Sequence, residues 1–275
     1  MKKKCGIVIL NYNSYDLTLD LVNKIVNYNE LDEICVVDNN SNDNFDGVFK
    51  NKKVKYIKNN INSGYAAGNN IGLRYLVEKK KCDILFIANP DVYFENKTVK
   101  CIKDELIKNK ELYVLSCVNI EPGNRFTMRY FNFPTFIGTI LNCFFLTRKL
   151  NKLKTEKTQL KRINHGDKLI YVDAVPGSFF AIKKELLVKI NYLCEDTFLY
   201  YEELILGRQA YNLRCDVGIL TTCQYNHNHK RKSFQSIKEF NLNNDSLLIY
   251  YKKFKILNFF QEKIITLSMN YSSFS

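Results

Sequence analysis

Short apolar runs alternate with segments of helical period through the first half of the chain. Between the runs, apolar residues recur every three or four positions, as they do on the buried face of a helix. Strands that alternate with helices imply right-handed crossovers and parallel pairing. The first half therefore predicts an α/β domain with a mainly parallel central sheet flanked by helices. The expected strands are Gly6–Leu10, Glu33–Val37, Val54–Ile57, Ile84–Ala88 and Tyr113–Cys117, and the expected helices are Leu17–Val26, Asn70–Glu78 and Val99–Lys108.

The pattern changes in the second half of the chain. Residues 129–168 are rich first in aromatic and then in basic side chains, and we expect a loop or a loosely helical insertion there. Residues 236–266 regain a helical period, with apolar side chains on one side. These features divide the chain into a domain at 1–233 and a basic, amphipathic helical extension at 234–275. Within the domain we expect strands at Leu169–Val175 and Val217–Leu220, a short helix from about Lys183, and a helix at Glu202–Asn212.

Polar residues directly follow three of the predicted strands. Because ligands of parallel α/β sheets bind beyond the carboxyl ends of the strands, these residues predict a site at one edge of the sheet. Asp38 can accept hydrogen bonds from a ribose or a base, and Asp91 offers the hard oxygen that a divalent cation on a pyrophosphate requires. Turn chemistry is the competing explanation, since Asn, Asp and Ser favour strand-to-loop turns. The candidates are Asn11, Asn13, Asp38, Asn40, Asn89 and Asp91.

The segment Asn62–Asn70 combines glycines and alanines at the opening of a helix. Gly64 and Gly68 would let a ligand approach the backbone closely, and a helix N-terminus favours anions. Tight packing of the helix on the sheet explains the same glycines, and their spacing matches neither the dinucleotide-binding fingerprint nor a P-loop. The candidate binding residues here are Asn62, Gly64, Tyr65, Gly68 and Asn69.

Two acids, an arginine and a histidine are further candidates. Glu202 and Glu203 open a predicted helix, where one of them can act as a general base on an acceptor hydroxyl, or both can simply benefit from the helix dipole. Arg208 on the same helix can pair with an acid or a phosphate. His227 can complete a metal shell as a neutral imidazole, or it is a surface histidine beside the basic run that follows it.

The formal charge of +13 is concentrated in two segments. Residues 148–168 hold eight lysines and arginines against two acids, and residues 226–275 hold eight against three. Two explanations fit this distribution equally well. The charges lie on the solvated faces of a lysine-rich protein, or they form a surface that contacts anionic lipid headgroups or a phosphorylated carrier. No helix-turn-helix, zinc-finger or RRM pattern accompanies the charge, which argues against nucleic acid as a partner.

The composition indicates a globular protein of the cytoplasm. Hydrophobic residues make up 46% of the chain, enough for a sizeable core. None of the nine cysteines forms a C-x-x-C pair, and several lie in apolar runs, as expected for buried thiols in a reducing compartment. The apolar run Cys5–Leu10 is too short for a signal peptide or a membrane span. We therefore expect a cytoplasmic protein, with any membrane contact made at the inner face.

Taken in order, seven short motifs resemble those of glycosyltransferase family 2, especially its bacterial rhamnosyltransferase-like members. The resemblance extends over about residues 5–233. It implies a GT-A nucleotide-diphosphosugar fold, an inverting single displacement, and a nucleoside held by Asp38 and the segment that begins at Asn62. The motifs lie at Asn11–Asn13, Val36–Asp43, Asn62–Gly72, Asn89–Val92, Val175–Glu185, Phe198–Glu203 and His227.

The resemblance also implies roles for single residues. Asp91 corresponds to the last acid of the D-x-D metal motif and His227 to a histidine that contacts metal or phosphate, with Mg²⁺ or Mn²⁺ as the cofactor. Glu203 falls where the family places its catalytic Asp. Gly177 and Ser178 would line the pocket for the donor sugar and the acceptor.

Two residues depart from the family pattern. Asn89 replaces the first acid of D-x-D, which leaves fewer charged metal ligands. Glu203 is one methylene longer than the usual Asp, which leaves Glu202 as an alternative base. The chain has no tryptophan and lacks both the Q-x-x-R-W signature and the membrane spans of processive synthases, so we expect a non-processive enzyme.

Together these features predict transfer of a sugar, with rhamnose as the leading candidate, from a nucleotide-diphosphosugar to a glycan or lipid-linked acceptor in bacterial surface polysaccharide synthesis. A sugar-nucleotide pyrophosphorylase is an alternative with the same fold, although such enzymes carry a Gly-, Arg- or Lys-rich loop where this chain has Asn11–Ser14. A non-catalytic carbohydrate- or membrane-binding module is the other alternative.

Overall fold

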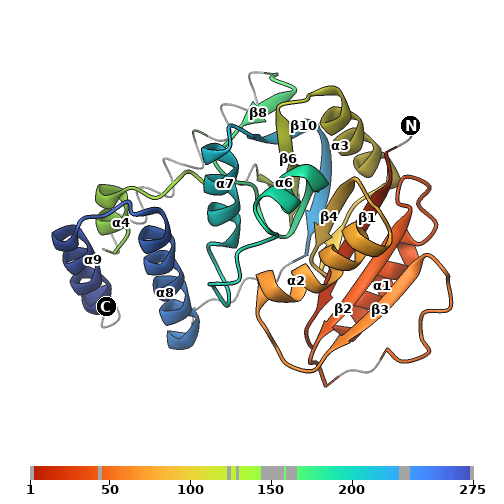
Figure 1. Ribbon diagram of the computed structural model, residues 1–275, viewed down its shortest axis with the longest axis horizontal. Helices are drawn as coiled ribbons and strands as arrows, with labels where there is room; N and C mark the ends of the chain where they lie inside the picture. Colours follow the sequence, from red (N-terminus) through yellow and green to blue (C-terminus); the bar gives the residue numbers. More distant parts are fainter. Residues whose placement is uncertain are drawn as a thin grey trace.

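The computed structural model describes residues 3–42, 45–122, 125–127, 130–143, 158, 166–228 and 236–272. Within these ranges a ten-stranded sheet forms the centre of the molecule, with helices on both of its faces (Figure 1). Its main path runs in the order β3-β2-β1-β4-β9-β6-β10-β5, with β7 paired to β6 and β8 to β10. Most of the basic segment 148–168 lies outside the described residues.

Four parallel strands form the half of the sheet that comes first in the sequence. They are β1 (Cys5–Asn11), β2 (Glu33–Asn39), β3 (Val54–Asn59) and β4 (Ile84–Ala88). All four lie where the sequence predicts strands, and β4 has the predicted bounds. The reason is that each is a short apolar or β-branched run bounded by polar residues, which favours a strand over a helix.

The other half of the sheet is mixed. Strand β9 runs antiparallel between β4 and β6, although β6 and β10 are parallel to each other. The mainly parallel arrangement predicted from the sequence therefore holds for β1–β4 and for the β6–β10 pair, and β9 interrupts it. The remaining strands are β5 (Val92–Tyr93), β6 (Leu112–Glu121), β7 (Arg125–Thr127), β8 (Leu169–Tyr171), β9 (Phe179–Lys183) and β10 (Asp216–His227).

The helices lie close to their predicted positions, with two differences. Helix α2 begins at Tyr65 instead of Asn70, and the C-terminal helical segment is two helices, separated at Lys255, which has a φ of 50°. The helices are α1 (Tyr15–Ile25), α2 (Tyr65–Arg74, continued by the π-helical turn Tyr75–Lys79), α3 (Asn96–Lys108), α4 (Phe136–Cys143), α6 (Lys184–Lys189), α7 (Glu202–Asn212), α8 (Ile237–Phe254) and α9 (Phe259–Ser272).

Two apolar layers cover the two faces of the sheet. Side chains alternate along a strand, so Val8 of β1 belongs to the apolar cluster that includes α2, α6 and α7, while Ile7 and Ile9 belong to the cluster that includes α1 and α3. All three are fully buried, as expected for a strand covered on both faces. None of the nine cysteines forms a disulfide, and six of them are buried, which agrees with the sequence prediction.

A third cluster joins the C-terminal helices to the domain. Ile205 of α7 packs with Leu247 and Tyr250 of α8 and with Ile265 of α9. Figure 1 shows α4, α8 and α9 grouped at the end of the molecule that is remote from β3. No helix in the described ranges has both the length and the apolarity needed to cross a bilayer.

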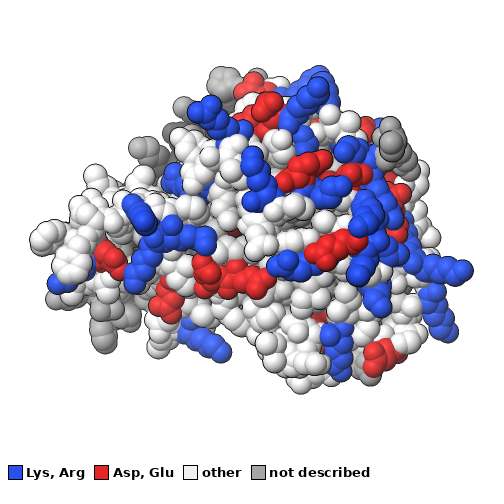
Figure 2. All heavy atoms as spheres, in the orientation of Figure 1, with Lys and Arg blue, Asp and Glu red and all other residues white. Residues whose placement is uncertain are grey.

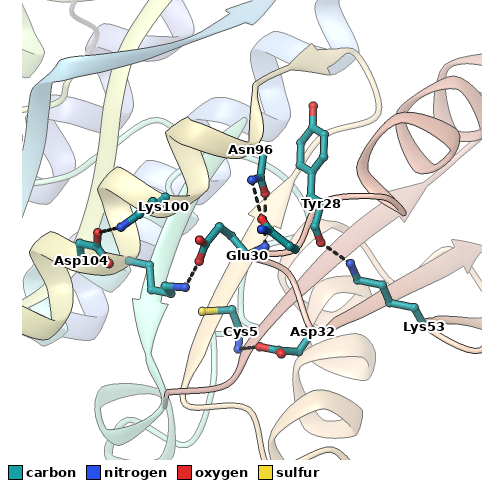
Figure 3. A network of polar contacts seen from close by, with 10 residues as sticks. Cys5, Tyr28, Glu30, Asp32, Lys53, Asn96, Lys100 and Asp104 are labelled. Carbon is teal, nitrogen blue, oxygen red and sulfur yellow. Dashed lines mark hydrogen bonds and ion pairs between the residues drawn. The ribbon is translucent and has the colours of Figure 1, made fainter.

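A polar network holds the amino-terminal edge of the sheet (Figure 3). Lys103 of α3 is 8% exposed and pairs with Glu30, while the backbone amide of Cys5 donates to Asp32 at 2.8 Å. The amide of Glu30 donates in turn to Asn96 at the start of α3. These contacts tie the loop between α1 and β2 to α3. The network therefore stabilises the edge opposite to the one where the polar strand ends gather.

Candidate active site

Strand register brings distant segments to one edge of the sheet. Asn11 at the end of β1 pairs with Asp38 of β2, and Ala88 at the end of β4 lies opposite Phe179 of β9. Strand β9 runs in the reverse direction, so the residues that precede it sit beside those that follow β4. The backbone amide of Asn89 accordingly donates to the carbonyl of Ser178 at 2.9 Å. This carboxyl-terminal edge carries the predicted site residues of four strands.

Asp38 and Asn11 form a buried hydrogen-bonded unit below this edge. Asn11 Nδ2 donates to Asp38 Oδ1 at 3.2 Å and to Ser41 Oγ at 2.9 Å, and Thr18 donates to Asn11 Oδ1 at 2.7 Å. Tyr56 reaches Asp38 Oδ2 at 3.5 Å. Neither Asp38 nor Asn11 has exposed surface. In this structure the two residues therefore fix the loop above them and do not themselves face solvent.

Asn13 and Asn40 shape the exposed loops on top of that unit. Both adopt left-handed backbone conformations, with φ values of 50° and 66°, which asparagine tolerates better than most residues. Asn13 Oδ1 accepts from the amide of Asn42 at 3.0 Å, and the amide of Asn13 donates to Ser41 Oγ at 2.8 Å. The two loops are thus joined to each other, with both asparagines at the surface.

Asn39 contacts the candidate site residues but is not among those predicted from the sequence. Its Nδ2 donates to Asn62 Oδ1 at 2.9 Å and to the carbonyl of Gly64 at 3.1 Å, and its Oδ1 accepts from the amide of Ser63 at 3.2 Å. It therefore ties the end of β2 to the start of α2. The sequence signal that could have indicated Asn39 is its position directly after Asp38, the residue predicted to contact the nucleoside.

Glycine is required at positions 64 and 68, at the start of α2, for two different structural reasons. Gly64 has a φ of 86°, and a Cβ there would overlap the carbonyl oxygen of Phe198. A Cβ at Gly68 would lie 2.7 Å from Leu10, so this glycine allows close packing of α2 on β1. Asn69 is fully buried and donates to the carbonyl of Tyr65 at 2.9 Å, while its Oδ1 has no hydrogen-bond partner among the described residues.

The peptide of Gly177 connects a tyrosine and a carboxylate. Its amide donates to Glu203 Oε1 at 3.0 Å, and its carbonyl accepts from the hydroxyl of Tyr65 at 2.5 Å. Burial raises the pKa of Glu203. Burial and the nearby Glu203 carboxylate raise the pKa of Tyr65 well above its usual value. Glu203 is thus held at the turn before β9, with a higher proton affinity than an exposed glutamate.

Glu202 occupies a different environment from its neighbour. It is 6% exposed, and burial together with the charge of Glu203 raises its pKa to about 8. Glu203 is only partly buried and accepts from the Gly177 turn. The geometry therefore favours Glu203 over Glu202 as the carboxylate that meets a ligand at the sheet edge.

Ser178 and Tyr225 complete this part of the site. The Ser178 and Tyr225 hydroxyls lie 2.9 Å apart, which connects the turn before β9 to β10. The Tyr225 hydroxyl is also close enough to Tyr65 to influence its pKa. Tyr225 is not among the residues predicted from the sequence. The register of β10 relative to the other strands, which brings it here, has no local sequence signal.

Asp91 and His227 meet at the edge because β5 and β10 pair antiparallel. His227 lies opposite Val92, and the amide of Asn228 donates to the carbonyl of Asp91 at 3.0 Å. His227 Nε2 is 3.3 Å from Asp91 Oδ1, and both side chains are partly exposed. A carboxylate and an imidazole fit a Mg²⁺ or Mn²⁺ ion that takes its other ligands from phosphate oxygens and water. Among the described residues no group of three or more His, Cys, Asp or Glu side chains forms a complete metal site, so such an ion would depend on the nucleotide.

Arg208 points away from the two acids. Its Nε donates to the hydroxyl of Tyr250 on α8 at 2.9 Å, and its guanidinium lies 3.7 Å from the ring centroid of Phe133. Five positions separate Arg208 from Glu203, which rotates it by about 140° around an α-helix. The arginine therefore connects α7 to the C-terminal helices, whereas Glu203 faces the sheet edge.

A central mixed sheet with helices on both faces is the fold of the GT-A glycosyltransferases. The fold comparison agrees. The mannosyltransferase PcManGT from Pyrobaculum calidifontis, in complex with GDP-Man and Mn²⁺, superimposes with a TM-score of 0.62 at 13% identity, covering 99% of this chain and 70% of that one. GalNAc-T7 with UDP, GalNAc and Mn²⁺ gives 0.63 at 13% identity, covering 91% and 48%. TarS from S. aureus gives 0.59 at 15% identity, covering 98% and 72%.

The sequence comparison is more specific. Residues 6–187 match the model of glycosyl transferase family 2, and the chain belongs to this family. A related protein is the low-salt glycan biosynthesis hexosyltransferase Agl10 from Haloferax volcanii, which is 26% identical over 213 residues. The match covers 78% of this chain and 63% of Agl10, so the chain spans less than two thirds of the length of that relative.

Proposed function

We propose that this protein transfers a hexose, with inversion and without processivity, from a nucleoside-diphosphate sugar to an acceptor hydroxyl. The observation that carries the proposal is the contact between Gly177 and Glu203, which holds a carboxylate over the same sheet edge as Asp91 and His227. The family membership and the GT-A fold support the same reaction class. The catalytic domain is residues 1–233, with a helical extension at 234–275.

Glu203 serves as the base. As the acceptor hydroxyl attacks the anomeric carbon, Glu203 takes its proton, and the diphosphate leaves from the opposite face of the sugar. The sugar passes through a transition state with oxocarbenium character. The raised pKa of Glu203 suits this role, because a base with a higher pKa has a greater affinity for the proton that it accepts.

Asp91 and His227 would hold a divalent cation together with the diphosphate. Such an ion would supply charge neutralisation for the departing nucleoside diphosphate. PcManGT and GalNAc-T7, which share this fold, are structures with Mn²⁺, and Mg²⁺ is the other candidate here. Asn39 and Asn62 hold the loop that receives the nucleoside, and Asp38 and Asn11 support that loop from below.

Rhamnose is the leading donor sugar and a glycan or lipid-linked sugar the acceptor, in the assembly of a surface polysaccharide at the cytoplasmic face of the membrane. Agl10 is named for glycan biosynthesis, and PcManGT is in complex with GDP-Man, so mannose belongs among the donors to be tested. A pyrophosphorylase or a binding module would share the fold but would not transfer a sugar from the donor.

A donor panel tests the proposal. Thermal stabilisation by dTDP-rhamnose, GDP-mannose, UDP-glucose, UDP-galactose and UDP-N-acetylhexosamines is measured with Mn²⁺ and with a chelator, and the stabilising donors are then tested for transfer or hydrolysis. Glu203→Gln should keep the stabilisation and lose turnover, whereas Asp91→Asn should lose the part that depends on Mn²⁺. Full turnover by Glu203→Gln would refute the assignment of the base. Stabilisation without turnover of any donor, with a range of acceptors, would favour the binding module.

A further inference from the structure

Exposed apolar side chains concentrate on α4 and α9. Phe260 is 75% exposed and Ile137 is 68% exposed, values that are unusual for such large apolar residues. Figure 2 shows that the end of the molecule where α4 and α9 lie is mostly free of charged side chains, whereas both signs of charge are spread over the rest of this face. The exposed apolar side chains of the two helices are Ile137, Leu141, Phe259, Phe260, Ile264 and Leu267, and we call them the terminal apolar surface.

Helix α9 is apolar on two sides. Its inner side places Ile265 and Met269 in the cluster with α8. On its outer side Phe260, Ile264 and Leu267 follow one another at spacings of four and three, which aligns them in one stripe along the helix. The inner contacts account for the first set only. The outer stripe therefore needs a partner that the described part of the chain does not provide.

Helix α4 continues the terminal apolar surface. It contacts α9 and contains no charged residue. The hydroxyl of Thr139 lies 2.6 Å from that of Tyr251, which fixes one side of α4 against α8. Ile137 and Leu141 are four positions apart and share the exposed side. Two packed helices thus present apolar side chains outward.

Cationic side chains border this surface. Lys263 lies over the ring of Phe259, 4.4 Å from its centroid, and Lys252 pairs with Glu262 at 3.2 Å. Lys255 follows at the end of α8. Apolar side chains bordered by positive charge are typical of helices that lie in the interface of an anionic membrane.

We propose that the terminal apolar surface docks on the surface of an anionic lipid bilayer. A bilayer supplies both an apolar layer for Phe260 and Ile264 and negative headgroups for the lysines around them. A two-fold contact with a second copy of this chain would bury the same phenylalanines but bring like-charged lysines together. The bilayer therefore matches both features of the surface.

The inference rests on the proposed function and deepens it. Helices α8 and α9 pack on Ile205 of α7, the helix that carries Glu203. A membrane contact through α9 would hold the catalytic helix near the bilayer that contains a lipid-linked acceptor. A soluble donor reaches the site without the membrane, so hydrolysis of the donor does not depend on docking.

The test is co-sedimentation of the full chain with vesicles of phosphatidylcholine, alone or mixed with phosphatidylglycerol. We expect binding to the anionic vesicles that weakens as salt is raised. The double variant Phe259→Ser, Phe260→Ser should bind at least ~10-fold more weakly, since two large apolar contacts are removed. Lys263→Glu should weaken binding to anionic vesicles only. The matched control is Ile107→Ser, Val188→Ser, which removes exposed apolar side chains from α3 and α6 and should bind normally.

Two results would overturn the inference: no binding of the parent chain to anionic vesicles, or equal binding by the double variant. Light scattering distinguishes the second-copy alternative, because a dimer that the double variant abolishes, without vesicle binding, would make this surface a dimer contact. Donor turnover is measured on the same proteins. Vesicle binding without any turnover would support membrane docking and count against the proposed function. Turnover without vesicle binding would support the proposed function and refute membrane docking.

Discussion

Replacing Gly177 with alanine would test the position of the proposed base directly. A Cβ on Gly177 would overlap Glu203 Oε1 and lie 2.9 Å from Cδ of the same side chain. The φ of Gly177 is not in the left-handed region, so the backbone itself accepts alanine. Glu203 would have to move away, and its hydrogen bond with the Gly177 amide would be lost or lengthened.

The size of the effect follows from this one contact. A hydrogen bond to a charged group is worth about 1.5–3 kcal/mol, and each ~1.4 kcal/mol in an activation barrier is a factor of ten. We therefore expect kcat to fall roughly tenfold to hundredfold. Because the metal and nucleoside contacts are on other segments, and only the sugar is expected to lie near Gly177, kcat should fall by a larger factor than the KM for the donor rises.

The assay is steady-state turnover of the best donor, with melting temperature and donor-induced stabilisation measured on the same protein. Gly218→Ala is the control, since a Cβ there meets the flexible ends of Leu169 and Leu112 far from the acids. It should lose some stability and keep its kcat. The reasoning would be refuted if the Gly177→Ala protein is folded and its kcat stays within about a factor of two of the parent value, since a loss of roughly tenfold or more is expected. The placement of Glu203 at this turn would then be unimportant for the reaction.

Four other substitutions give independent checks. Tyr65→Phe removes the hydroxyl that holds the Gly177 carbonyl, so kcat should fall by about tenfold with an unchanged donor KM, and a fall in donor binding alone would argue against this positioning role. Gly64→Ala forces a side chain against the Phe198 carbonyl at a φ of 86°, so thermal melting should show destabilisation by at least ~1 kcal/mol. Asp91→Asn should raise the Mn²⁺ concentration needed for half-maximal activity, and an unchanged metal titration would exclude Asp91 as a ligand. Burial raises the pKa of Glu202 from 4.5 to about 8, so between these pH values the folded state binds a proton that the unfolded state has lost. The free energy of unfolding should therefore fall as pH rises from 4.5 to about 8, and in Glu202→Gln the melting temperature should depend less on pH in this range.

The parallel half of the fold could be predicted from local sequence; in the mixed half the strands predicted at Tyr113–Cys117 and Val217–Leu220 lie within β6 and β10, but β9 and its pairing could not be predicted. Ile84–Ala88 is a fully apolar run between Asp83 and Asn89, so both bounds of β4 are visible in the sequence. Phe179–Ile182 is just as apolar, but it continues into a helix-forming segment without a break, and short apolar runs do not distinguish strand from helix. The insertion of β9 between β4 and β6 depends on pairing with residues that are far away in the chain.

The start of α2 shows how glycines obscure a helix. Gly64, Gly68 and Gly72 lower the local helix propensity, and the helix expected from the sequence starts only at Asn70. In the structure Gly68 and Gly72 lie against Leu10 and Val8, so the loss of propensity is offset by close packing on β1. The packing explanation therefore holds for two of the glycines, and Gly64 alone is required by its backbone conformation.

The choice between Glu202 and Glu203 could not be made from sequence because the two are neighbours with the same chemistry. Adjacent residues on a helix point about 100° apart, so a rotation of α7 by that amount would exchange their positions. The chain enters α7 through Tyr200 and Tyr201, which have φ values of 76° and 69°, and no sequence rule predicts two consecutive left-handed tyrosines. With this entry, Glu203 receives the Gly177 amide and Glu202 is buried.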